Sequence, residues 1–154
     1  MMSPCDLDLK RQRRVLLADD DPDFRLFLAA TLRSDGHEVI EASDGADLLD
    51  RLGGSLLEPE HGAIDLVITD VRMPSWSGLQ ALASLAGQGW PVVVITAFGS
   101  PKVHEDAARL GAVASFDKPF DIDELREIVR AELSAERSPP LRSSHDLPPT
   151  GAPL

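Results

Sequence analysis

The chain has 154 residues, enough for one ordinary domain with a single hydrophobic core. It carries 26 acidic residues against 15 Lys and Arg, and its formal net charge of −11 disfavours electrostatic attraction to nucleic acids or anionic membranes. The single cysteine, Cys5, has no partner for a disulfide or a cysteine-based metal site. No apolar run approaches the roughly 18 residues of a membrane-spanning helix. We therefore expect a cytoplasmic protein that binds neither nucleic acid nor membranes.

Composition predicts three parts. Residues 1–14 include a cluster of basic residues just before an apolar run and are expected to be a flexible N-terminal segment. Residues 134–154 are rich in Pro and Ser and lack apolar periodicity, which predicts a disordered tail. The folded domain is therefore expected to span residues 15–133.

Five short apolar runs predict β-strands, at residues 15–18, 38–41, 64–69, 92–96 and 112–116. Segments with helical periodicity lie between and after them. This alternation is typical of an α/β protein with a doubly wound, five-stranded parallel sheet that helices cover on both faces.

Five helices are expected to follow the strands. Pro22 suits the first position of the first helix, which Gly36 ends, and its apolar stripe comprises Phe24, Phe27, Leu28, Thr31 and Leu32. The second helix follows the N-cap candidates Ser43 and Asp44, and its apolar positions are Leu48, Leu49 and Leu52. Residues 55–62 are interpreted as a surface connection. The remaining helices are predicted at residues 78–86, 101–110 and 121–133, the last with Ile122, Leu125, Ile128 and Val129 facing inward.

Acidic residues follow two of the predicted strands. The first strand ends in Asp19, Asp20 and Asp21, and the third ends in Asp70. Ligands of doubly wound sheets bind beyond the carboxyl ends of the strands, so these side chains are expected to meet at one edge. Clustered carboxylates repel one another unless a cation balances them, and an all-oxygen site suits Mg²⁺. We infer a Mg²⁺ site in which Asp20 and Asp70 are ligands and Asp19 acts through water.

Two further residues at this edge suggest phosphoryl chemistry. Thr96 ends the fourth strand and Lys118 follows the fifth. A carboxylate near Mg²⁺ and a lysine can attack a phosphoryl group, because both cations neutralise charge on the phosphoryl oxygens. Each residue alone also fits an ordinary turn, strand-end or surface role. Their joint occurrence at four strand ends favours a site that handles phosphoryl groups.

Four segments carry a resemblance to a known family. They are LLADDDP at residues 16–22, DLVITDVRMP with a later glycine at residues 65–78, VITA at 94–97 and DKPF at 117–120. Together they resemble the receiver domain of two-component response regulators, over residues 15 to about 133. The resemblance implies a flavodoxin-like (βα)5 fold with strand order 2-1-3-4-5. It also implies a signalling protein rather than an enzyme, similar to stand-alone chemotaxis regulators.

The resemblance implies a role for each site residue. Asp70 would accept a phosphoryl group from a sensor histidine kinase or a histidine phosphotransfer protein, and a downstream effector protein would read the result. Thr96 would be the switch hydroxyl, and Lys118 would pair with the phosphoryl group. The Mg²⁺ site would comprise Asp20, Asp70 and the backbone carbonyl of Arg72, with Asp19 contributing through water. The bond from Lys118 to Pro119 is commonly cis in such proteins.

One position departs from the family pattern. Three residues before Lys118, where relatives often carry Tyr or Phe that rotates on activation, this chain has Ser115. Strand alternation puts the neighbouring Phe116 on the opposite face of the sheet. Coupling between Thr96 and an aromatic rotamer is therefore in question.

Two alternatives remain. Phosphohydrolases of the haloacid dehalogenase type also use an aspartate after a first strand, and Asp19 with Asp21 matches their start. Against that reading, Asp23 stands where those enzymes have Thr or Val, and no acidic pair ends a strand after the lysine. The second alternative is a receiver-like binding module that is no longer phosphorylated. The presence of all the chemical residues argues against it.

Overall fold

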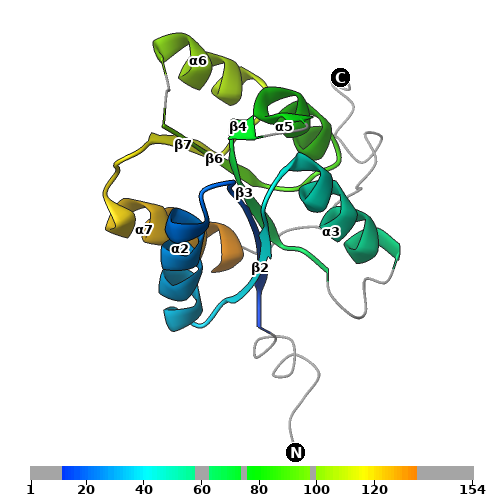
Figure 1. Cartoon of the computed structure of the whole chain (residues 1–154), viewed down its shortest axis with the longest axis vertical. Coiled ribbons are helices and arrows are strands. Elements are labelled where there is room, and N and C mark those ends of the chain that lie inside the picture. The colour runs from blue at the N-terminus through cyan, green and yellow to red at the C-terminus, as the bar shows by residue number, and fades with distance from the viewer. Residues whose placement is uncertain (1–11, 58–62, 74–75, 98–99, 135–154) are drawn as a thin grey trace, which may run out of the picture.

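A five-stranded parallel sheet forms the centre of the molecule (Figure 1). The computed structural model describes residues 12–57, 63–73, 76–97 and 100–134. The strands of the sheet are β1 (Arg14–Ala18), β2 (Glu38–Ala42), β3 (Leu66–Asp70), β6 (Val92–Thr96) and β7 (Ala114–Asp117). Their spatial order is β2-β1-β3-β6-β7, and every neighbouring pair is parallel. The predicted doubly wound sheet with order 2-1-3-4-5 is confirmed.

Helices cover both faces of the sheet (Figure 1). The helices α2 (Pro22–Ser34) and α7 (Ile122–Ser134) pack on one face. The helices α3 (Gly45–Leu57), α5 (Gly78–Gly87) and α6 (Pro101–Arg109) pack on the other. Because both faces are covered, every residue of β3 and β6 is buried.

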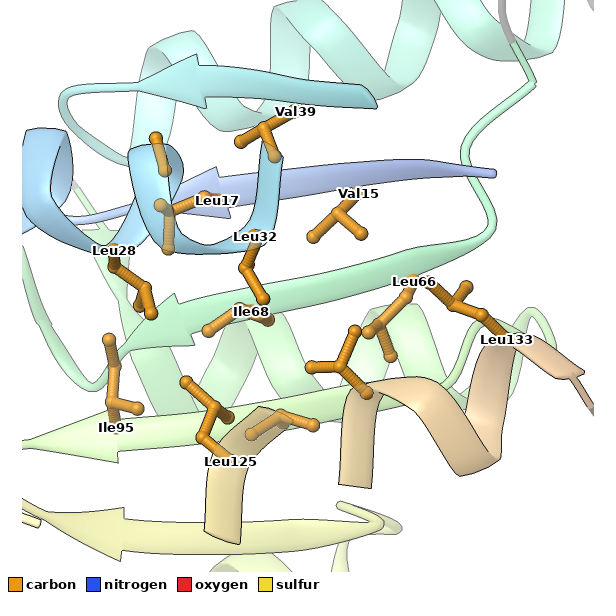
Figure 2. Packing of buried hydrophobic residues seen from close by; sticks show 13 residues of the cluster. Val15, Leu17, Leu28, Leu32, Val39, Leu66, Ile68, Ile95, Leu125 and Leu133 are labelled. Carbon is orange, nitrogen blue, oxygen red and sulfur yellow. The ribbon is translucent and has the colours of Figure 1, made fainter. Parts of the chain in front are cut away.

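Alternate residues along each strand enter two separate hydrophobic clusters. Val15 and Leu17 of β1 belong to the cluster that also contains Leu28 of α2 and Leu125 of α7 (Figure 2). Their neighbours on β1 enter the cluster under α3, α5 and α6. Both clusters fix the sheet between its helices, and so fix where the carboxyl ends of the strands lie.

Side-chain caps define where three helices begin. The Asp21 carboxylate accepts hydrogen bonds from the backbone N–H groups of Asp23 and Phe24, with Pro22 at the first position of α2. Asp44 caps α3 by accepting from the N–H of Asp47. Ser100 caps α6. Of the two predicted N-cap candidates before α3, Asp44 fills this role.

Two apolar positions assigned to buried stripes are exposed. Phe27 of α2 is 55% exposed, and Leu49 of α3 is 46% exposed. The buried residues of α2 are Leu28, Ala29 and Leu32. The buried stripe therefore includes Ala29 and excludes Phe27. Each residue turns the helix by about 100°, so a residue next to a buried one lies at the margin of the buried stripe.

The boundaries of several elements differ from those predicted. β7 starts at Ala114 rather than at residue 112, because the chain first makes a turn in which the N–H of Ala112 bonds to the carbonyl of Ala107. Gly111, with φ +109°, makes this turn. A short antiparallel hairpin, β4 (Arg72–Met73) with β5 (Trp76–Ser77), was not predicted. Residues 55–57 of the expected surface connection belong to α3.

Some predicted features lie outside the described residues. These are most of the N-terminal segment (1–11), the rest of the surface connection (58–62) and the tail from residue 135, together with Pro74 of the DLVITDVRMP segment. Within the part of the chain that the structure describes, no helix is both long enough and apolar enough to cross a membrane.

Candidate functional site

Three carboxylates meet at the carboxyl edge of the sheet. One oxygen each from Asp19, Asp20 and Asp70 lies within 4.8 Å of the others. Asp19 and Asp20 follow β1, and Asp70 ends β3. The two strands are neighbours, with Ala18 opposite Thr69, so the residues that follow come together. The sequence prediction that these three aspartates converge is correct.

Lys118 enters this acidic cluster from the segment after β7. Its Nζ atom lies 2.6 Å from Oδ2 of Asp19 and 3.1 Å from Oδ2 of Asp70. The same Nζ lies 4.3 Å from the centroid of the Phe24 ring of α2. The Lys118–Pro119 peptide bond is cis, as expected. One ammonium group therefore bridges two buried carboxylates.

Burial and charge shift the pKa values within the cluster. Burial raises the pKa of Asp19, and the hydrogen bond from Lys118 offsets this only in part. Burial alone would lower the pKa of Lys118, but its hydrogen bond to Asp19 and the charges of Asp19 and Asp70 raise it overall. Lys118 therefore stays positively charged at neutral pH, and one lysine faces three carboxyl groups. An all-oxygen donor set with excess negative charge fits Mg²⁺.

Both the carboxylate and the backbone of Asp19 form hydrogen bonds with neighbouring groups. Its Oδ1 accepts from the N–H of Asp21 at 2.9 Å, and its own N–H donates to the carbonyl of Ala42. Nη1 of Arg25 donates to the Asp19 carbonyl oxygen at 2.7 Å, while Nε of Arg25 contacts Glu41. Asp19 is fully buried, whereas Asp20 is exposed. Arg25 was not predicted as a site residue, because no sequence pattern shows which arginine reaches the backbone carbonyl of Asp19.

The Asp70 carboxylate is fixed from two directions. Its Oδ1 accepts a hydrogen bond from the backbone N–H of Arg72 at 3.0 Å, and its Oδ2 faces Lys118. Asp70 is only 5% exposed, so its carboxylate is largely shielded from bulk water. The backbone of Arg72 thus lies beside the carboxylate, and the metal-binding role of its carbonyl stays a prediction.

Thr96 lies between the strands that carry Asp70 and Lys118. The register pairs Asp70 with Ile95, so Thr96 is the next residue on the adjacent strand. On its other side Thr96 pairs with Asp117, and its carbonyl accepts from the N–H of Lys118 at 2.8 Å. Asp70, Thr96 and Lys118 therefore come from three adjacent strands at one edge of the sheet.

The face of β7 under α6 carries a polar bridge. Nδ1 of His104 lies 2.6 Å from Oγ of Ser115, and its Nε2 lies 2.9 Å from Oδ1 of Asp117. Phe116 packs on the opposite face, 5.3 Å from the ring of Phe120, as alternation predicts. Sequence analysis missed His104, because nothing in a helix sequence shows which strand residues lie under it.

Comparison with known proteins identifies the family. The family model described as "Response regulator receiver domain" matches residues 15–130. The chain belongs to the response regulator receiver family. Receiver domains are phosphorylation-dependent signalling modules rather than enzymes of the usual kind, and they generally bind Mg²⁺ at an acidic site such as this one. They interact with histidine kinases or histidine phosphotransfer proteins and with effectors.

Two curated relatives of different length match this chain. The transcriptional regulatory protein PdtaR of Mycobacterium tuberculosis is 39% identical over 134 residues, which are 86% of this chain and 61% of that protein. The chain thus spans about three fifths of the length of PdtaR. Sporulation initiation phosphotransferase F of Bacillus subtilis is 30% identical over 122 residues, 78% of this chain and 93% of that protein.

Solved structures show the same receiver fold. The receiver domain of NtrX from Brucella abortus superposes with a TM-score of 0.69 at 28% identity, covering 79% of this chain and 99% of that one. The chemotaxis response regulator CheY4 of Vibrio cholerae gives a TM-score of 0.66 at 25% identity, with 79% and 99% covered. The structure disfavours the phosphohydrolase alternative, because the Asp21 carboxylate caps α2.

Proposed function

We propose that this receiver domain is a switch in which Asp70 accepts a phosphoryl group from a phosphohistidine of a sensor histidine kinase or a histidine phosphotransfer protein. One observation carries the proposal. Nζ of Lys118 contacts Asp70 and Asp19 together, in a cluster that also includes Asp20. A carboxylate beside an ammonium group and two further carboxyl groups is equipped to take up a phosphoryl group and to bind the divalent cation that this reaction needs.

The reaction balances without a further reactant. An oxygen of Asp70 attacks phosphorus, the bond between phosphorus and the histidine nitrogen breaks, and the imidazole leaves with the electron pair and takes up a proton. Lys118 neutralises charge on the phosphoryl oxygens from its position 3.1 Å from Oδ2. Autodephosphorylation by water would return Asp70 to the carboxylate.

The Mg²⁺ site follows from the same residues. Asp20, Asp70 and the backbone carbonyl of Arg72 would be its protein ligands, and Asp19 would act through water. This assignment is supported by the exposure of Asp20, whereas Asp19 is fully buried. When bound, Mg²⁺ supplies positive charge to the phosphoryl oxygens.

Phosphorylation would change the charge at the edge and thereby the surface around it. The phosphoryl group replaces one negative charge by about two and adds acceptor oxygens, which attract the Thr96 hydroxyl and the Lys118 ammonium group. Both residues are joined through the backbone of β6 and β7. We propose that the resulting shift between two conformations alters the surface of α6, β7 and α7, which a downstream effector reads.

An exposed apolar surface on α2 is suited to contact the histidine kinase or phosphotransfer protein. Leu26 and Phe27 of α2 are 56% and 55% exposed, and the N-terminus of α2 adjoins the aspartates after β1. An exposed apolar pair of this kind is a natural contact for a partner protein. The net charge of −11 favours a protein partner over nucleic acid or a membrane, and the single cysteine suits the reducing cytoplasm.

Intact-mass measurement tests the proposal. The chain is incubated with acetyl phosphate, with and without Mg²⁺, beside the variants Asp70→Asn, Asp19→Asn and the control Asp50→Asn on the exposed side of α3. We expect one phosphoryl adduct that requires Mg²⁺, is absent in Asp70→Asn and persists in Asp50→Asn. An adduct that persists in Asp70→Asn but needs Asp19 would indicate the phosphohydrolase instead. Folded protein that binds Mg²⁺ but forms no adduct would indicate a binding module.

A further inference from the structure

The bridge centred on His104 connects α6 to β7 at two points. Ser115 and Asp117 are two positions apart on β7, so their side chains point to the same face of the sheet. The His104 ring lies over this face and reaches both, at 2.6 Å and 2.9 Å. Its side chain is 27% exposed, so the ring lies between the helix and the strand rather than in bulk solvent.

The partners determine which ring nitrogen carries the proton in neutral His104. Ionised Asp117 can only accept a hydrogen bond, so Nε2 donates to its Oδ1. Nδ1 then accepts from the hydroxyl of Ser115. Both hydrogen bonds are satisfied in this arrangement, and each has good heavy-atom geometry.

Both ends of the bridge lead to residues of the phosphorylation site. On the helix side, the N–H of His104 bonds to the carbonyl of Ser100, the N-cap of α6, which lies four residues after Thr96. On the strand side, Asp117 pairs with Thr96 across the sheet and directly precedes Lys118. A displacement of Thr96 and Lys118 toward Asp70 therefore changes the geometry of the His104 bridge.

We propose that His104 is a positioning residue that couples the phosphorylation site to α6. Its two hydrogen bonds hold α6 on β7 in the arrangement in which the Asp70 carboxylate is bonded to Lys118, and phosphorylation of Asp70 weakens that hold. The inference rests on the proposed function of Asp70. Relatives often carry an aromatic ring at the strand position that Ser115 occupies here. In this chain, Ser115 instead makes a polar contact with His104 of α6.

The bridge has a predictable energetic effect. A net hydrogen bond contributes about 1 kcal/mol, a factor of about five in an equilibrium constant. If the bridge stabilises one of two conformations, loss of one of its two hydrogen bonds increases the population of the other conformation by about that factor. Phosphorylation by a small donor, which proceeds from the conformation that phosphorylation favours, then becomes faster by the same factor.

The experiment measures phosphorylation rate and amide hydrogen exchange together. Wild type, His104→Ala and Asp117→Ala are treated with acetyl phosphate and Mg²⁺, and exchange is followed over residues 101–109 before and after phosphorylation. The matched control is Glu105→Ala, an exposed neighbour on the same helix. His104→Gln places an amide nitrogen where Nε2 lies and is expected to keep the bond to Asp117.

We expect phosphorylation to speed exchange in α6 of the wild-type chain and of Glu105→Ala. In His104→Ala and Asp117→Ala, exchange should be fast already; the phosphorylation rate should rise about fivefold in Asp117→Ala, which removes one hydrogen bond, and at least as much in His104→Ala, which removes both. The double variant should rise no further than His104→Ala, because that substitution already removes the contact with Asp117. His104→Gln should bring the phosphorylation rate and the exchange of α6 part of the way back to the wild-type values. If His104 acted only by packing, keeping the hydrogen bond to Asp117 would have no such effect.

The outcomes separate the two proposals. Normal phosphorylation of the wild-type chain, with unchanged rate and unchanged α6 exchange in both folded bridge variants, would overturn the coupling alone. Absence of any adduct on wild type would overturn the proposed function and the coupling with it. If His104→Ala fails to fold, Ser115→Ala and Asp117→Ala each remove one hydrogen bond of the bridge and supply the comparison with smaller changes of shape.

Discussion

The ammonium nitrogen of Lys118 lies 2.6 Å from Oδ2 of Asp19, although the two residues are 99 positions apart in the chain. Asp19 is fully buried, and Lys118 keeps only 16% of its side chain exposed. The same nitrogen contacts Asp70 at 3.1 Å. The ammonium group of Lys118 thus contacts carboxylates from the first and third strands of the domain. The acidic cluster therefore forms only when the whole sheet is assembled.

Removal of Lys118 should destabilise the protein when no divalent cation is present. Lys118→Met leaves Asp19 and Asp70 buried without their cationic partner, and we expect the free energy of unfolding to fall by about 2–3 kcal/mol. Urea denaturation in the presence of a chelator measures the change. Lys102→Met, at a lysine whose side chain is 81% exposed, is the matched control and should change the free energy by less than about 0.5 kcal/mol.

A second substitution tests the cause of that loss. Asp19→Asn removes the buried charge that Lys118 balances, so in the Lys118→Met background it should recover part of the lost stability. Additive losses from the two substitutions would show that the pair is not coupled. Such a result would contradict the role assigned to this contact.

Mg²⁺ should stabilise the folded chain through the three aspartates. Above the dissociation constant, each tenfold increase in free Mg²⁺ should raise the free energy of unfolding by about 1.4 kcal/mol, because the ion binds the folded state. Urea denaturation over a series of Mg²⁺ concentrations measures this slope. Asp20→Asn should move the onset of this increase to a higher Mg²⁺ concentration, while Asp50→Asn should not. The same onset in wild type and Asp20→Asn would argue against Asp20 as a ligand.

The sheet and the acidic edge were predictable because local sequence signals determine them. Apolar runs that end in Asp19, Asp70 and Thr96 mark both the strand and its carboxyl end, and parallel strands bring those ends to one edge. Asp20 and Lys118 follow from the same reasoning. The side chains that contact one another there are therefore largely fixed by the order of the strands.

The residues that support the site were not predictable in this way. Arg25 contacts the carbonyl of Asp19, and His104 contacts Ser115 and Asp117. These contacts depend on how each helix is rotated and placed over the sheet, which periodicity gives only to within about one residue. The error at Phe27, expected to be buried but 55% exposed, has the same origin.

Asp35 and Arg126 should make stability depend on pH in acid. Oδ1 and Oδ2 of Asp35 accept from Nη2 and Nε of Arg126 at 2.6 Å and 2.8 Å, joining the end of α2 to α7. This hydrogen bond lowers the pKa of Asp35 below its usual value of 3.8. A carboxyl group with a lower pKa in the folded state stabilises above its unfolded pKa, and the stabilisation is lost as pH falls through the folded value.

The measurement is the free energy of unfolding between pH 7 and pH 2. Wild type should lose stability below about pH 4 more steeply than Asp35→Asn, whose amide cannot titrate. Asp50→Asn, away from the contact between α2 and α7, should keep the wild-type slope. A slope in Asp35→Asn that matches wild type throughout this range would rule out the proposed contribution.

Gly111 should tolerate substitution worse than Gly36, although both have positive φ. Gly111 has φ +109°, and a Cβ added there would lie 2.9 Å from Cβ of Ala86 on α5. Gly36 has φ +97° and nothing within 4 Å of the added atom. Gly36→Ala therefore carries the backbone cost alone, about 1–2 kcal/mol, whereas Gly111→Ala adds a steric cost of similar size.

Urea denaturation of both variants separates these two costs. Gly111→Ala should lose about 2–4 kcal/mol and Gly36→Ala about half of that. Ala86→Gly removes the atom that the new Cβ would meet, so in the Gly111→Ala background it should recover the steric part, reduced by about 1 kcal/mol for a glycine in a helix. Equal losses from Gly36→Ala and Gly111→Ala would show that α5 moves away freely. The close approach of α5 to the turn before β7 would then not constrain the position of that strand.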